Sequence, residues 1–162
     1  TKNDLLLTMT MMISLNLENL FEDLNNAKHI YVIASGYTQK NAADELKRNF
    51  LTVDKMVYVI DNAMPDILLD KITRNDVVFA FTLSGENNDM INFFNNLKIK
   101  PILASITKLS NNTIAKMSDY NIPFVTHEVF EYESRTNISP ISQFYVVIDF
   151  IILKYLSYNE KK

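Results

Sequence analysis

The stretch Phe79–Asp89, "FAFTLSGENND", holds one of only two glycines in a chain of 162 residues. An apolar run typical of a strand precedes Gly85, and a segment typical of a helix follows it. The other glycine, Gly36, occupies the same kind of place in "YVIASGYTQKNAADEL" (31–46), and Ser and Thr lie close to both. Because glycine tolerates positive φ and lets a ligand approach the backbone, both segments predict strand-to-helix turns suited to binding.

The alternation of apolar run and helix extends along most of the chain. Apolar runs lie at 29–35, 56–60, 76–82, 101–107 and 120–125. Apolar residues with the spacing of a helix occur at 38–50, 64–72, 88–98 and 112–117, and again from about Pro140. The pattern predicts a doubly wound α/β fold, a three-layer sandwich whose five-stranded parallel sheet is flanked by helices. Ligands of such sheets bind outside the carboxyl ends of the strands, where both glycine turns fall.

Two segments lie outside this alternation. Residues 1–27 are helical in character and are predicted to form a linker region ahead of a domain at 28–158. Residues 126–139 are the one long irregular stretch. Phe144–Leu156 is apolar almost all round, yet it is shorter than the ~20 residues that a spanning helix needs, and Asp149 interrupts it. It predicts a helix buried in the core or in a subunit interface, with no membrane contact.

The composition narrows the possible functions. The net charge is -3 and the basic residues are scattered, so the chain shows no basic patch for nucleic acid. The absence of cysteine excludes disulfides and thiolate metal sites and fits a reducing, cytoplasmic setting. We expect no signal peptide, metal or cofactor. Because the chain starts at Thr1 rather than Met, we also expect it to be a piece of a longer protein.

The residues around the two glycines suit an anion. The helix that follows each turn begins with unpaired N–H groups and the positive end of its dipole. Ser35 and Thr38 in the first turn, and Thr82, Ser84 and Asn87 in the second, add hydroxyls and an amide. The alternative is that these residues are ordinary helix caps. Neither turn has the glycines of a dinucleotide-binding motif or the lysine of a P-loop.

Four segments resemble a sugar isomerase (SIS) domain in order and spacing. They are "IYVIASGYTQKNAADEL", "DVVFAFTLSGENNDMI", "KPILASIT" and "IAKMSDYNIPF", within roughly 28–156. The most specific part is Ser-Gly-Glu at 84–86. The chain looks most like the C-terminal effector-binding domain of RpiR-type transcriptional regulators, and its segment "SRTNISPISQFYVVIDFIIL" resembles their closing helix. Family members usually have more glycine in the first turn and a Thr after Ser-Gly-Glu, where this chain has Tyr37 and Asn87.

The resemblance implies a phosphosugar-binding domain that controls DNA binding by a helix-turn-helix domain absent from this chain. The implied phosphate contacts are Ser35, Gly36 and Thr38 on one side and Thr82, Ser84, Gly85, Glu86 and Asn87 on the other, with Thr107 facing the sugar. The apolar closing helix predicts a homodimer or homotetramer. The identity of the sugar phosphate stays open.

A sugar-phosphate isomerase with the same fold is the alternative, and it needs a positioned base. His29 opens a strand at the end away from the turns, which indicates a structural role. His127 lies in the long irregular stretch with Glu128, Glu131 and Glu133. Two interpretations are open: this cluster supplies a base, or it is a solvated acidic loop. Its spacing does not match that of known metal sites. We expect a ligand sensor rather than an enzyme. A dimerisation domain with a vestigial pocket is the third interpretation.

Overall fold

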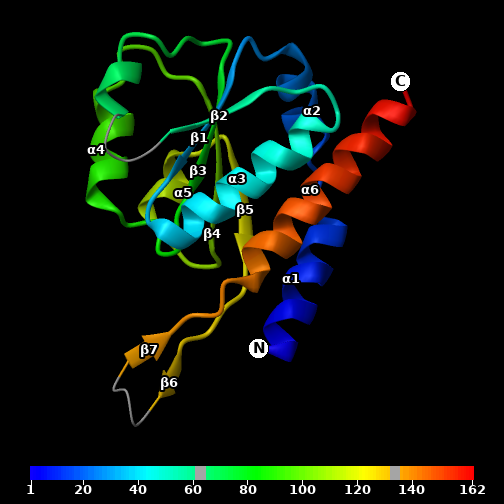
Figure 1. The fold of residues 1–162 in the computed structure, drawn as a ribbon, viewed down its shortest axis with the longest axis vertical. Helices are drawn as coiled ribbons and strands as arrows, with labels where there is room; N and C mark the ends of the chain where they lie inside the picture. The colour runs from blue at the N-terminus through cyan, green and yellow to red at the C-terminus, as the bar shows by residue number, and fades with distance from the viewer. Residues whose placement is uncertain (61–64, 132–135) are drawn as a thin grey trace.

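The computed structural model describes residues 1–60, 65–131 and 136–162. Its main feature is a five-stranded parallel sheet with the strand order β2-β1-β3-β4-β5 (Figure 1). The strands are β1 (Ile30–Ala34), β2 (Val57–Ile60), β3 (Val77–Phe81), β4 (Ile102–Lys108) and β5 (Tyr120–Phe124). The predicted doubly wound α/β architecture is therefore confirmed.

Helices cover both faces of this sheet, as Figure 1 shows. One face carries α1 (Lys2–Ser14), α2 (Glu18–Asn26), α3 (Tyr37–Leu51) and α6 (Ser142–Glu160). The other carries the 3-10 turn η1 (Pro65–Leu68), α4 (Asn88–Asn96) and α5 (Thr113–Met117). Along β3, Phe79 and Phe81 enter the core under α3 and α6, while Val78 and Ala80 enter the opposite core. Burial on both faces explains why the strands read as continuous apolar runs.

The N-terminal region forms two helices that pack on the sheet domain. Asp4, Thr8 and Met12 are spaced by four along α1, and all three are buried. α1 runs beside α6 (Figure 1). The Oγ1 atom of Thr8 accepts a hydrogen bond from the N–H of Val125, just after β5, at 2.9 Å. α1 is thus attached to the carboxyl end of the sheet as well as to α6.

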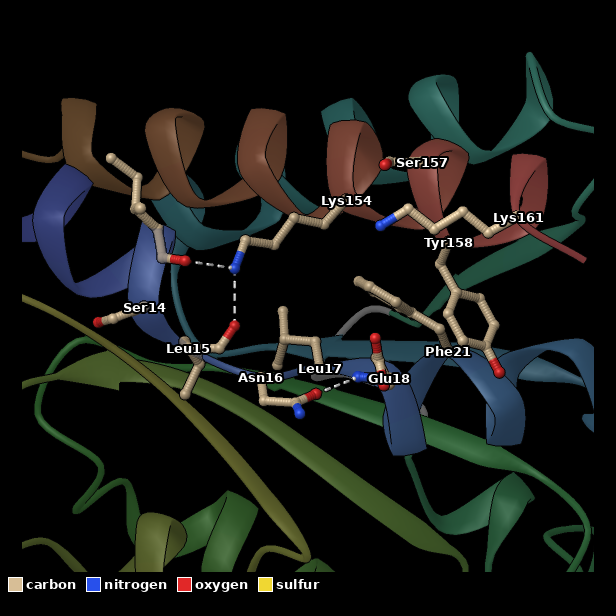
Figure 2. Close-up of a pocket in the computed structure, with 11 residues that line it drawn as sticks. Ser14, Leu15, Asn16, Leu17, Glu18, Phe21, Lys154, Ser157, Tyr158 and Lys161 are labelled. Carbon is tan, nitrogen blue, oxygen red and sulfur yellow. Dashed lines mark hydrogen bonds between the residues drawn. The ribbon is translucent and has the colours of Figure 1, made fainter.

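The chain between α1 and α2 is fixed by Lys154 of α6. The Lys154 ammonium donates hydrogen bonds to the carbonyl oxygens of Ile13, at 3.1 Å, and Leu15, at 2.6 Å (Figure 2). Burial lowers the pKa of Lys154. A cavity of about 310 Å³ opens beside this contact, and Phe21 and Tyr158 form part of its wall. None of the predicted phosphate contacts lines it.

Two segments differ from the sequence-based expectation. Of the helix predicted at 64–72, residue 64 lies outside the described residues and the rest contains only the turn η1, although Leu68 and Ile72 are still buried against the sheet. The stretch 126–139, predicted to be irregular, contains an antiparallel hairpin of β6 (Val129–Glu131) and β7 (Thr136–Ile138). The hairpin projects from the body of the molecule (Figure 1). Strands of three residues are too short for a readable alternation. Within the described ranges, no helix is long and apolar enough to cross a bilayer.

Candidate functional site

The two glycine turns lie side by side at the carboxyl edge of the sheet. β1 pairs directly with β3, and Ala34 is in register with Phe81 at their ends. The N–H of Ser35 donates to the carbonyl of Phe81 at 3.0 Å, and the Ser35 hydroxyl lies 3.4 Å from the same oxygen. Since neighbouring strands are about 4.8 Å apart, the turns face one small region. The prediction that both turns share this edge is confirmed.

This edge is also the point where the strand order reverses. From β1 the chain crosses through α3 to β2 on one side, and from β3 it crosses through α4 to β4 on the other. α3 and α4 cover opposite faces of the sheet (Figure 1). A crevice forms at such a reversal in open α/β sheets, and ligands bind there. The fold therefore singles out the region between the two turns.

The first turn leads into a helix whose N-cap residue is a glycine. Gly36 precedes α3 with φ of 106° and makes no side-chain cap bond to the first N–H groups of α3. Thr38 is half-buried there, and the side chain of Tyr37 is 82% exposed. An uncapped N-terminus of a 15-residue helix leaves its amides and dipole to an anion.

The second turn, by contrast, is bonded internally. The N–H of Gly85 donates to Thr82 Oγ1 at 3.3 Å, and the N–H of Glu86 donates to Ser84 Oγ at 3.1 Å. Thr82 is buried and Ser84 is exposed. Asn87 Oδ1 accepts from the N–H of Met90 at 2.9 Å, so Asn87 is the cap of α4. Ser84 acts as an acceptor within the turn, and its own O–H hydrogen is left for a further bond.

The start of helix α5 contacts the second turn. The N–H and the hydroxyl of Thr113 each donate to the Glu86 carboxylate, both at 2.8 Å. These bonds hold the pKa of the Glu86 carboxyl below its usual value. The N–H of Ile114 donates to the carbonyl of Gly85 at 3.0 Å. Glu86 is therefore already engaged with the protein.

Thr107 lies deeper than the two turns. It is fully buried at the end of β4. Its Oγ1 accepts hydrogen bonds from the side-chain amides of Asn112, at 3.2 Å, and Asn121, at 3.1 Å. The structure thus places it in a polar network beneath α5, and its expected contact with a sugar stays a prediction. Asn112 and Thr113 were not predicted from the sequence, although an Asn before a short helix is a recognisable cap signal.

The two histidines have separate partners. The N–H and Nδ1 of His29 lie 3.0 and 2.9 Å from the buried carboxylate of Asp76, which fits the structural role predicted for this residue. His127 Nδ1 lies 2.7 Å from the carboxylate of Asp4 in α1. Glu133 is outside the described residues. In the part of the chain that the structure describes, no group of three or more His, Cys, Asp or Glu side chains is placed to hold a metal ion.

The reversal point and the open start of α3 define a doubly wound α/β protein with a candidate anion site between its central strands. The chain belongs to the SIS domain family, whose model matches residues 23–151. It is similar to the HTH-type transcriptional regulator GlvR of Bacillus subtilis (strain 168), with 29% identity over 139 residues. That match covers 85% of this chain and 54% of GlvR. The chain spans about half the length of the curated relatives it matches.

Solved structures agree on the fold. The sugar isomerase domain of an RpiR transcription factor from Sphaerobacter thermophilus superposes with a TM-score of 0.76 and 14% identity, covering 99% of this chain and 93% of that one. The E. coli CFT073 protein c3406, solved in complex with a sugar phosphate, gives a TM-score of 0.74 and 18% identity, covering 98% and 86% of the two chains. The resemblance to SIS domains is confirmed. At these identities the structures support the fold and leave the site residues as predictions.

Proposed function

We propose that this chain is the phosphosugar-binding, effector-sensing domain of an RpiR-type transcriptional regulator. The observation that carries the proposal is the meeting of two hydroxyl-rich glycine turns at the reversal point of a SIS domain. The similarity to GlvR, an HTH-type regulator, favours a sensor. DNA contact belongs, in this proposal, to a helix-turn-helix domain in another part of the protein.

The proposed site divides the phosphate between the two turns. Ser35, Gly36 and Thr38 present the uncapped amides of α3. In this proposal the second turn contributes Thr82, Ser84 and the backbone at 85–87, with Thr107 below; the Gly85 and Glu86 N–H groups are bonded within the turn, to Thr82 and Ser84, when no ligand is bound. Neither turn contains Lys or Arg, so neutral N–H and O–H donors share the phosphate charge, as at other helix N-termini. The sugar phosphate complex of the similarly folded c3406 supports a small phosphorylated ligand.

We propose binding without catalysis, and we assign no catalytic residue, metal or cofactor. Isomerisation requires a positioned base, and His127, the candidate base, follows the edge strand β5, which β4 separates from the strands that carry the two glycine turns. The test is to incubate the protein with each sugar phosphate that it binds and to follow aldose–ketose interconversion by NMR. Turnover that a His127→Ala change abolishes would establish the isomerase alternative instead.

The critical experiment for the site concerns Ser84. Ser84→Ala removes a hydroxyl donor to an anion, which is worth roughly 1.5–3 kcal/mol. We therefore expect a roughly tenfold to hundredfold loss of affinity for a sugar phosphate that binds the wild type. Calorimetric titration against a panel of sugar phosphates measures this.

The matched control for Ser84→Ala is Ser14→Ala. The Ser14 hydroxyl bonds only to carbonyls of its own helix α1, so its loss should leave affinity unchanged. If Ser84→Ala lowers the melting temperature and leaves affinity at the wild-type value, Ser84 serves the turn alone and the site is wrongly placed.

A further inference from the structure

The second turn is held against α5 by contacts that involve three successive residues at the start of this helix. Both oxygens of the Glu86 carboxylate accept from Thr113, and the Gly85 carbonyl accepts from the N–H of Ile114. Gly85 also packs directly on the side chain of Asn112. A Cβ atom at Gly85 would lie 2.7 Å from the Asn112 Cβ and closer still to its Oδ1. The turn thus sits on the first residues of α5 with no room between them.

The Asn112 side chain is itself held by hydrogen bonds to α5 and to β4. It is 1% exposed, and its Oδ1 accepts from the N–H of Ala115 at 2.8 Å, which caps α5. Its Nδ2 donates to Thr107 Oγ1 in β4 at 3.2 Å. The start of α5 is therefore tied to the sheet through Thr107, and the second turn is tied to the start of α5.

The chemistry of Glu86 argues against a direct phosphate contact. The residue is ionised at neutral pH, as an ordinary glutamate is, and the bonds from Thr113 lower the pKa of its carboxyl further. An ionised carboxylate can only accept hydrogen bonds, so it offers a phosphate no donor and repels its charge. Both of its oxygens are also turned toward Thr113.

We propose that Glu86 and Thr113 form a clamp that positions the Ser84–Gly85 turn for the phosphate, and that Glu86 is a positioning residue rather than a ligand contact. This inference rests on the proposed function. Opening the clamp takes no group away from the ligand. It loosens the turn against α5, although the bond from the Ile114 N–H to the Gly85 carbonyl remains, so the Ser84 hydroxyl and the neighbouring amides lose part of the geometry that phosphate binding needs.

The test uses the whole 162-residue chain and four changes: Thr113→Val, Glu86→Ala, the double variant and Glu86→Gln. Titration with a sugar phosphate that binds the wild type should show Thr113→Val weaker by about threefold to tenfold, although the ligand does not touch Thr113. The double variant should bind no more weakly than Glu86→Ala, because both changes open one clamp. Glu86→Gln should bind at least as tightly as the wild type, since its amide can still pair with both groups of Thr113 and no longer repels the phosphate.

Two matched controls lie elsewhere in the chain. Thr52→Val removes a hydroxyl that bonds to the carbonyl of Asn49, and Glu45→Gln alters a carboxylate paired with Arg48. Both should bind like the wild type. In the absence of ligand, hydrogen exchange of the 84–87 amides should accelerate in Thr113→Val and Glu86→Ala and not in the controls.

Each other outcome has a distinct meaning. Wild-type affinity in Thr113→Val, with or without faster exchange at 84–87, overturns the clamp and leaves the proposed function standing. A wild type that binds no member of the sugar phosphate panel overturns the proposed function and the clamp with it.

Discussion

Gly36 and Gly85 both have positive φ, 106° and 71°, but a methyl group at the two positions would meet different surroundings. At Gly85 it would overlap the buried Asn112 side chain, whereas at Gly36 it would meet only the flexible end of Gln39, at 2.7 Å. Both alanine variants share the cost of positive φ. We expect Gly85→Ala to lose about 1–3 kcal/mol more free energy of unfolding than Gly36→Ala, because a tightly packed site has to move.

Urea unfolding of the two alanine variants measures that difference. The double variant Gly85→Ala, Asn112→Ala serves as the control, since it removes the obstructing side chain and should cost less than the two single changes summed. Equal losses in Gly36→Ala and Gly85→Ala would show that α5 does not press on the second turn.

A second prediction at the scale of residues concerns Asp4 and pH. The hydrogen bond from the His127 ring, partly opposed by burial, lowers the pKa of the Asp4 carboxyl from 3.8. Because the pKa is lower in the folded than in the unfolded state, this pair stabilises the fold above about pH 4, and its contribution falls as pH drops through the folded-state pKa. The stability difference between wild type and Asp4→Asn should shrink as the pH falls below about 4. A difference that stays constant on acidification would contradict the pairing.

At the scale of elements, the attachment of α1 can be tested at Lys154. Its ammonium satisfies two carbonyls at the end of α1, so Lys154→Met should cost about 1 kcal/mol of unfolding free energy and accelerate hydrogen exchange near Ser14. Lys47→Met, at an exposed position of α3, is the matched control. Unchanged exchange in α1 would mean that apolar packing alone holds its end.

The sequence was informative about elements with a readable pattern and uninformative about η1, β6 and β7. The five strands read as apolar runs and the helices have a clear period, so the number, class and order along the chain of these elements could be predicted from the residues. η1 is a single turn, and β6 and β7 have three residues each, which is less than a period can reveal.

In the candidate site, too, local patterns could be predicted from the sequence and contacts between distant residues could not. The glycine turns could be found because each is a local pattern next to a strand. The Glu86–Thr113 pair joins residues 27 positions apart, and the cap role of Asn87 depends on which way its side chain turns. Contacts of this kind follow from packing α5 on the second turn, which no local spacing encodes.

For the whole molecule, the exposed apolar residues of α1 and α6 predict a homodimer or homotetramer. Leu6, Leu7, Met9 and Ile13 of α1 and Tyr145, Leu153 and Leu156 of α6 are all exposed. Apolar patches of this kind usually mark interfaces. Ile13→Glu and Leu153→Glu should each raise the dissociation constant at least about tenfold, since each places an unpaired charge in the interface.

Analytical ultracentrifugation at micromolar protein measures this assembly. Leu51→Glu is the control, because Leu51 is similarly exposed, at 57%, but lies at the end of α3. A wild type that sediments as a monomer would refute the prediction, and dissociation by Leu51→Glu alone would move the interface to another face.

The strand order has a consequence for the thermodynamics of binding. β1 and β3 carry the two turns, and each is paired on both sides and buried on both faces. Strands in such positions are generally the last to open in native-state fluctuations. A ligand at their ends therefore meets a backbone that is already ordered, and little conformational entropy is lost when it binds. Small, weakly interacting groups such as hydroxyls and amides are enough for useful affinity when their positions are set in advance.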